Sequence, residues 1–263
     1  ACGGSNAAPD AGTLDAPAAD AAPAKVFAGL LSLSHTRTIS AEDSNDSSGG
    51  FGSFFNPIDG AMPAPLPADD GCLIDPAAAF PGTTQYRDAG NEVRLVAEQE
   101  APFVLTRQLV TGGIFYYLPP SPLDDNAVVP GLSYSFSWLG GAQLLAGGGM
   151  ELAIPNAVDL AEPSFQQTVS ADLAIAWTAE QAMQMLDITI SGYDSEAQKP
   201  VIILCRAFDD GGFTIDAPTM AALPSGFATL SIKRSSAGAH DLGNDEWLEL
   251  VGTSTTNTTL TIP

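Results

Sequence analysis

The chain has 263 residues, 45% of them hydrophobic, and its net charge is −22 because 31 acidic residues face only 9 basic ones. Such a length can bury a substantial core, as one large domain or two ordinary ones. The charge argues against nucleic acid as a partner, because phosphate binding requires clustered Lys and Arg. It also disfavours direct docking on an anionic membrane, so we expect membrane contact only through a lipid anchor.

Residues 1–25 have the composition of a flexible, disordered tether. They contain ten Ala, three Pro and three Gly, and no aromatic residue. Such a segment cannot bury enough apolar surface to offset its ordering entropy. Its opening, Ala1-Cys2-Gly3, resembles the end of a bacterial lipoprotein signal, in which a small residue precedes the lipidated Cys. We therefore expect Cys2 to be a lipid anchor, with a free thiol or an intermolecular disulfide as the alternative.

From Val26 onward the chain predicts short strands, because apolar and polar residues alternate between turns rich in Gly, Pro, Asn and Asp. Two short helices are predicted, over residues 178–185 and 218–223. About ten strands with turns every 8 to 12 residues are typical of an all-β sandwich. The candidate strands are residues 26–39, 91–96, 103–107, 132–138, 173–177, 186–190, 201–206, 228–233, 247–251 and 258–262.

The Gly-rich, Pro-bounded region 140–163 is the best internal boundary. We therefore predict two packed β-sandwich domains, over residues 26–150 and 151–263, after the tether 1–25. One larger sandwich is the alternative.

The second half resembles immunoglobulin and fibronectin type III sandwiches in the order of Pro163, a strand ending in Trp177, and the strands 186–190 and 201–206. The folded part also resembles uncharacterised surface lipoproteins of the myxobacterial type. This resemblance implies a fold and a location, and it brings no activity with it. The residues that carry it are Asp88-Ala89-Gly90, residues 130–134, Gly140-Gly141, Cys205 and residues 210–215.

No catalytic machinery is recognisable in the sequence. The two histidines, His35 and His240, lie near no Gly-x-Ser-x-Gly elbow, and we expect both to be exposed and far apart. The histidines and cysteines match no zinc-ligand spacing. We therefore expect a non-enzyme, with no hydroxyl–histidine–carboxylate constellation and no cofactor other than calcium.

Calcium is the one ligand that the acidic turns suggest, because it takes carboxylate and carbonyl oxygens from loops. The residues Asp43 to Gly49 look superficially like an EF-type loop, but position 12 of that loop is Phe54 instead of Glu. The densest acidic turn supplies the candidate calcium ligands, which are Asp241, Asn244, Asp245 and Glu246.

A disulfide between Cys72 and Cys205 is predicted, because these two remain once Cys2 is assigned to the tether. An exported protein rarely leaves two thiols unpaired. The bond would join the two halves of the chain. Two buried free thiols are the alternative.

Aromatic residues cluster at residues 51–55 and at residues 115–117. Consecutive residues of a strand point to opposite faces, so at least one of the second group could be exposed. We expect an exported protein, at the outer membrane, on the cell surface or outside the cell. Its predicted function is non-enzymatic binding or adhesion, with an unknown protein or carbohydrate ligand. The alternatives are self-assembly into a filament or coat through exchange of N- or C-terminal strands and, as a distant third, glycan-active catalysis.

Overall fold

The computed structural model describes residues 26–56, 67–76, 85–98, 102–110, 113–117, 127–180 and 184–263. The predicted tether and Cys2 lie outside these ranges. The described residues are 65% strand and 2% helix, so the prediction of an all-β fold is confirmed.

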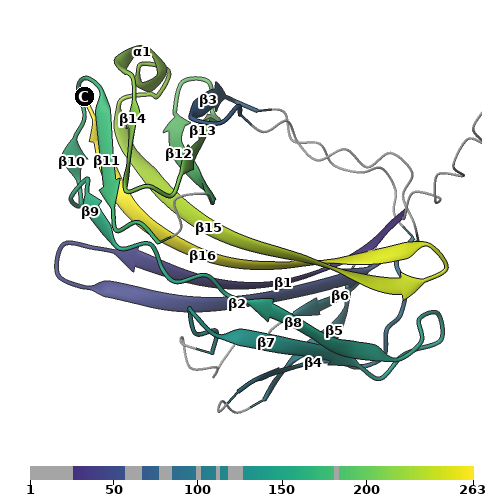
Figure 1. Ribbon diagram of the computed structural model, residues 1–263. Coiled ribbons are helices and arrows are strands. Elements are labelled where there is room, and N and C mark those ends of the chain that lie inside the picture. Colours follow the sequence, from purple (N-terminus) through teal and green to yellow (C-terminus); the bar gives the residue numbers. More distant parts are fainter. Residues whose placement is uncertain are drawn as a thin grey trace, which may run out of the picture.

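The main sheet of the described residues has thirteen strands (Figure 1). In spatial order, twelve of them are β3 (Gly71–Ile74), β13 (Lys199–Phe208), β12 (Met185–Asp194), β15 (Gly226–Gly243), β16 (Glu246–Ile262), β1 (Val26–Ile39), β2 (Ser44–Phe54), β6 (Gly113–Tyr117), β5 (Phe103–Val110), β4 (Glu92–Ala97), β7 (Ser133–Trp138) and β8 (Gly147–Ala153). The last, β10 (Gln167–Thr168), pairs with the end of β16. A second sheet holds β14 (Gly212–Ile215), β11 (Leu173–Trp177) and β9 (Leu160–Glu162).

The longest strands form the middle of the main sheet, and Figure 1 shows them as a curved band. β15 and β16 form a hairpin whose turn contains Asn244 and Asp245 at φ of 55° and 60°. Positive φ at both central residues matches the right-handed twist of the strands, and Asn and Asp tolerate it better than other non-glycine residues. β1 then pairs in parallel with β16 along twelve residue pairs.

Two hydrophobic cores lie against the same face of this band. The N-terminal core is formed by buried side chains of β1, β2 and β4 to β8, together with Leu248 and Leu250 of β16. The C-terminal core is formed by buried side chains of β11 to β15, together with Leu260 and Ile262 of β16. The two cores are separate, but the main sheet is continuous through both halves of the chain. The division into two sandwich domains therefore stays a prediction.

Edge strand β8 turns back onto the long hairpin. The Ser236 hydroxyl donates a hydrogen bond to the Ala153 carbonyl. A Cβ at Gly252 would lie 2.6 Å from the same oxygen, so only glycine permits this close approach.

Several strand predictions are confirmed, and others are corrected. Residues 247–251 and 258–262 belong to one strand, β16, rather than to two. The Ser- and Gly-rich segment after Asp43 is strand β2 instead of a loop, because it pairs with β1 along eleven residue pairs. The predicted helix over 178–185 is wrong where the structure describes it, since Met185 already begins β12.

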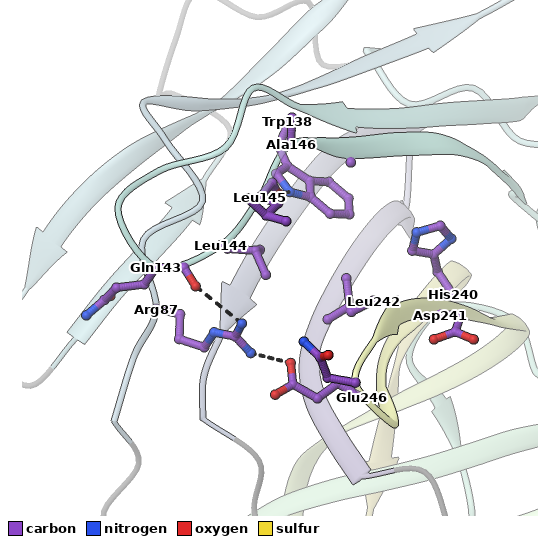
Figure 2. Close-up of a pocket in the computed structure, with 12 residues that line it drawn as sticks. Arg87, Trp138, Gln143, Leu144, Leu145, Ala146, His240, Asp241, Leu242 and Glu246 are labelled. Carbon is purple, nitrogen blue, oxygen red and sulfur yellow. Dashed lines mark hydrogen bonds and ion pairs between the residues drawn. The ribbon is translucent and has the colours of Figure 1, made fainter.

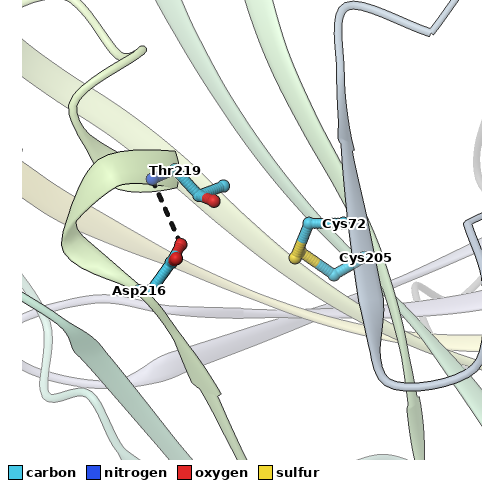
Figure 3. The surroundings of a disulfide bond; sticks show 4 residues. All are labelled: Cys72, Cys205, Asp216 and Thr219. Atoms are coloured by element: carbon cyan, nitrogen blue, oxygen red, sulfur yellow. Dashed lines mark hydrogen bonds between the residues drawn. A yellow bond between two sulfur atoms is a disulfide. The ribbon is translucent and has the colours of Figure 1, made fainter.

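The helix predicted at 218–223 is present as α1 (Ala217–Met220), with Pro218 near its start. Asp216 caps it by accepting a hydrogen bond from the Thr219 amide at 3.2 Å (Figure 3).

The Cys72–Cys205 disulfide is present, as predicted (Figure 3). The two cysteines face each other in the antiparallel ladder between β3 and β13, with their Cα atoms 4.0 Å apart. Cys205 is fully buried and Cys72 packs against the C-terminal core. The bond therefore attaches the four residues of β3, which come from the first half of the chain, to the second half.

Candidate functional site

The face of β16 that points to the two cores becomes polar between them. Ser254 and Thr256 are fully buried there, and Thr258 is 2% exposed. Ser254 lies opposite Arg234 of β15 on one side and opposite His35 of β1 on the other. A row of polar side chains therefore crosses three adjacent strands inside the protein.

His35 is buried, so the prediction that it is exposed is wrong; only 2% of the side chain is accessible. In the run Leu31-Ser32-Leu33-Ser34-His35, the histidine has the parity of the leucines. It therefore belongs to the face of β1 that points to the cores. Only its polarity suggested the exposed face.

His35 contacts both a hydroxyl and a carboxylate. Its Nδ1 lies 3.5 Å from Oγ of Ser254, and its Nε2 lies 3.7 Å from Oδ2 of Asp46. Burial lowers the pKa of His35, although the charge of Asp46 opposes this. The pKa of Asp46 is lowered chiefly by the hydrogen bond from Arg37, whose Nε lies 3.0 Å from Oδ1. The neutral imidazole is therefore the favoured form in the folded protein at neutral pH.

The expectation that no hydroxyl–histidine–carboxylate constellation exists is wrong, because Ser254, His35 and Asp46 form one. Ser254 is nevertheless not placed to act as a nucleophile. An attacking hydroxyl must reach its substrate, and Ser254 has no exposed surface. The cavities at the β15–β16 turn and beside α1 are lined by other residues. His240 lies opposite Leu248, six residues along β16 from Ser254, which is about 20 Å. The non-enzyme expectation stays a prediction.

Hydrogen bonds of Arg234 connect the polar row to the smaller sheet. Its guanidinium donates two hydrogen bonds to Asp209, with Nε 2.9 Å from Oδ2 and Nη2 3.0 Å from Oδ1. Asp209 is 1% exposed and also accepts from Nε1 of Trp177 at 2.8 Å. Glu180 adds a second carboxylate 3.1 Å from Nη1 of Arg234. Because these buried charges compensate one another, the network joins β15 to β11 as a structural link.

An open cavity of about 270 Å³ lies at the tip of the β15–β16 hairpin (Figure 2). We call it the hairpin-tip pocket. Trp138 and Leu145 line it from β7 and the loop after β7, and His240 and Asp241 line it from β15. Arg87, which precedes β4, lies at one side of the pocket, between Gln143 and Glu246.

The predicted calcium ligands gather at this tip. Glu246 is ion-paired with Arg87, as Figure 2 shows, and Asp241 accepts a hydrogen bond from the Gly243 amide at 2.9 Å. Among the described residues, no group of three or more His, Cys, Asp and Glu side chains is placed to hold a metal ion. A calcium site formed by Asp241, Asn244, Asp245 and Glu246 therefore stays a prediction.

The face of the long strands that points away from the two cores carries hydroxyl and amide side chains in register. We call it the outer face. One row crosses five adjacent strands and consists of Thr189, Ser231, Asn257, Thr38 and Asn45. Strands lie about 4.8 Å apart, so this row extends over about 19 Å. The amide oxygen of Asn257, in the centre of the row, is buried and has no hydrogen-bond partner.

Aromatic side chains continue the outer face beyond β1. Phe51 of β2 lies opposite Ser32 of β1 and opposite Tyr117 of β6. The ring centroids of Phe51 and Tyr117 are 5.4 Å apart, and Phe115 lies 5.8 Å from Phe51. Tyr116 lies between Phe115 and Tyr117 in sequence, points to the opposite face of β6 and is fully buried. The predicted alternation of residues 115–117 is confirmed, and two of the three aromatics are half-buried on the outer face.

No protein-family model matches the chain, and no curated protein is significantly similar to it. Among the described residues, no helix is long and apolar enough to cross a membrane.

Proposed function

We propose that this protein is an exported, non-enzymatic binding module whose outer face binds a polysaccharide chain. The observation that carries the proposal is the five-strand row from Thr189 to Asn45. Hydroxyl and amide groups both donate and accept hydrogen bonds, which is what the hydroxyls of a sugar polymer require.

The neighbouring rows strengthen the proposal. Thr255 lies opposite Lys233 on one side and Thr36 on the other, and Thr36 lies opposite Ser47. Rows two residues apart along a strand are about 7 Å from each other. The outer face thus repeats its polar groups in two directions, which suits an extended, repetitive ligand. Phe51, four residues along β2 from Ser47, and the rings of Phe115 and Tyr117 next to it supply apolar surface for the faces of sugar rings.

Export is supported by the Cys72–Cys205 disulfide, because disulfides persist in oxidising compartments. Lipid anchoring through Cys2 remains part of the proposal and concerns residues outside the described ranges. A net charge of −22 adds solubility in an extracellular medium.

Assembly by exchange of the C-terminal strand has less support. That segment lies within β16, between β15 on one side and β1 and β10 on the other. It would have to leave its own sheet before it could join another.

The experiment measures retention of the purified protein on insoluble polysaccharides and in gels that contain soluble ones. The double variant Thr255→Val/Asn257→Val removes two outer-face groups and should weaken binding at least tenfold, since each lost hydrogen bond contributes about 1 kcal/mol. Thr256→Val, on the opposite face of the same strand, should bind as the wild type does. Equal binding by the double variant, or no retention of the wild type on any polysaccharide, would overturn the proposal.

A further inference from the structure

Two large aromatic side chains are exposed on adjacent strands of the outer face. Tyr193 of β12 is 59% exposed and Phe227 of β15 is 69% exposed. Gly192 lies opposite Ala228 in the ladder between these strands, Tyr193 follows Gly192, and Phe227 precedes Ala228. Because Gly192 and Ala228 are buried on the core side, Tyr193 and Phe227 point to the outer face. We call these two residues the aromatic patch.

The side chains around the aromatic patch are uncharged. Tyr193 lies opposite Pro200 of β13, and Phe227 lies opposite Thr261 of β16. The next row of the outer face consists of Ile202, Ser191, Thr229 and Thr259. Neither of these two rows of described residues contains an acidic or basic side chain. Hydroxyl groups therefore border two exposed rings.

The charged side chains farther along the same face compensate one another. Asp187 lies six residues from Tyr193 along β12, which is about 20 Å. It is opposite Arg206 on one side and Lys233 on the other, with Oδ1 3.8 Å from Nε of Arg206 and Oδ2 3.0 Å from Nζ of Lys233. Both cations already face a carboxylate, and the net charge of −22 repels an anionic polymer. The outer face therefore favours an uncharged ligand.

Exposed rings bordered by hydroxyl groups suit the ring of a sugar. The C–H groups on one face of a pyranose ring pack against the electron-rich face of an aromatic ring. The hydroxyls of the same sugar can exchange hydrogen bonds with Ser and Thr side chains. An exposed apolar patch with polar groups at its rim is typical of a binding surface. The aromatic patch thus has the chemistry of a sugar-binding platform.

We propose that the aromatic patch anchors the polysaccharide and that this polysaccharide is neutral. The inference rests on the proposed function and adds the charge of the ligand and the residues that hold it. Tyr193 is four residues, or about 13 Å, from Thr189 along β12, and Thr189 begins the five-strand row. A chain anchored at the patch therefore continues over the polar rows. The rings supply apolar contact, and the rows supply hydrogen bonds.

The first test is affinity electrophoresis of the full chain in native gels that contain one soluble polymer. Two pairs of polymers share a backbone and differ in charge, namely hydroxyethylcellulose with carboxymethylcellulose and dextran with dextran sulfate. We expect the neutral member of at least one pair to bind at least tenfold more tightly than its anionic counterpart. Tighter binding of the anionic members, or no binding of either neutral polymer, would overturn the inference.

The second test compares variants on the neutral polymer that binds. Tyr193→Ala/Phe227→Ala should weaken binding at least tenfold, because two aromatic contacts are lost. Tyr193→Phe/Phe227→Tyr keeps both rings and should bind as the wild type does. As a control, Leu139→Ser/Leu145→Ser replaces leucines that are 81% and 88% exposed in the loop between β7 and β8, and it should also keep the wild-type affinity. All these side chains are exposed, so circular dichroism should show an unchanged fold.

The outcomes separate this inference from the proposed function. If Thr255→Val/Asn257→Val weakens binding and Tyr193→Ala/Phe227→Ala does not, the polar rows bind the polysaccharide without the aromatic patch, and this inference alone fails. It also fails alone if the aromatic variant keeps its affinity but dissociates a wild-type dimer in sedimentation velocity, because the patch is then an interface between copies. If the wild type binds no polysaccharide, soluble or insoluble, both fail.

Discussion

The two ends of β16 and its middle are equally buried but are stabilised differently. Leu248 and Leu250 at one end belong to the N-terminal core, and Leu260 and Ile262 at the other belong to the C-terminal core. Between them the same face carries buried hydroxyl groups and borders the charged side chains of the polar row. Burial of apolar side chains stabilises the two ends in proportion to the buried area. The polar side chains of the middle contribute little net stability, but a buried polar group that loses its partner is costly.

This difference shows why one strand can serve two cores. A continuous apolar face would merge the cores into one long layer. The polar middle requires specific partners, such as the Val158 carbonyl that accepts from the Thr256 hydroxyl at 2.7 Å. Hydrogen bonds of defined geometry therefore set where each core ends.

The largest expected effect concerns the covalent link at the C-terminal core. The variant Cys72→Ala/Cys205→Ala should lower the free energy of unfolding by about 5 kcal/mol, because the bond closes a loop of 133 residues. Urea unfolding followed by tryptophan fluorescence measures it. Cys2→Ala serves as the control and should unfold as the wild type does. A loss below about 1 kcal/mol would show that the link is not what stabilises this end.

The next effect concerns the buried charges of the polar row. Asp209→Ala should cost about 3 to 5 kcal/mol, since it leaves the Arg234 guanidinium buried without its main partner. The double variant Asp209→Ala/Arg234→Met should recover most of this loss. As a control, Asp187→Ala breaks the partly exposed pair with Lys233 and should cost at most about 1 kcal/mol. Similar losses in both single variants, measured by urea unfolding, would contradict the role given to burial.

A smaller effect concerns two neighbouring hydroxyls, whose removal should change the free energy of unfolding in opposite directions. Thr256→Val should cost about 1 to 2 kcal/mol, because the Val158 carbonyl loses its donor. Thr258→Val should stabilise by up to about 1 kcal/mol, because the buried hydroxyl of Thr258 has no partner. Thermal unfolding of the two variants side by side decides this, and a shift of both in the same direction would refute it.

The smallest effect is the dependence of stability on pH. Burial lowers the pKa of His35 in the folded state, so its contribution is complete above its usual value of 6.5 and is lost as the pH falls below that value. The pKa of Asp46 is also lowered, by Arg37, so a further loss follows below about pH 4. Burial raises the pKa of Glu249, which adds stability as the pH falls through that raised pKa. His35→Gln should remove only the first loss in unfolding curves measured from pH 7.5 to 4.5.

Local patterns in the sequence predicted much of the fold. The alternation in residues 26–39 and 133–138 predicts strands because side chains of a strand alternate between its faces wherever the strand pairs. Pro218 predicted the start of α1 because its φ suits a first helical turn. The Cys72–Cys205 bond followed from composition, since few cysteines leave few pairings. The acidic residues from Asp241 to Glu246 were found together at one turn because they are neighbours in sequence.

Which distant strands pair could be known only from the folded protein. β2 has a loop-like composition and becomes a strand because β1 supplies its partner, and β16 is continuous because β15 and β1 flank it. His35 and Ser254 are 219 residues apart and meet through the parallel register of β1 and β16. The outer-face row arises in the same way, from five strands aligned across the sheet. Alternation fixes which residues share a face of one strand, but register between strands depends on long-range packing that no local pattern encodes.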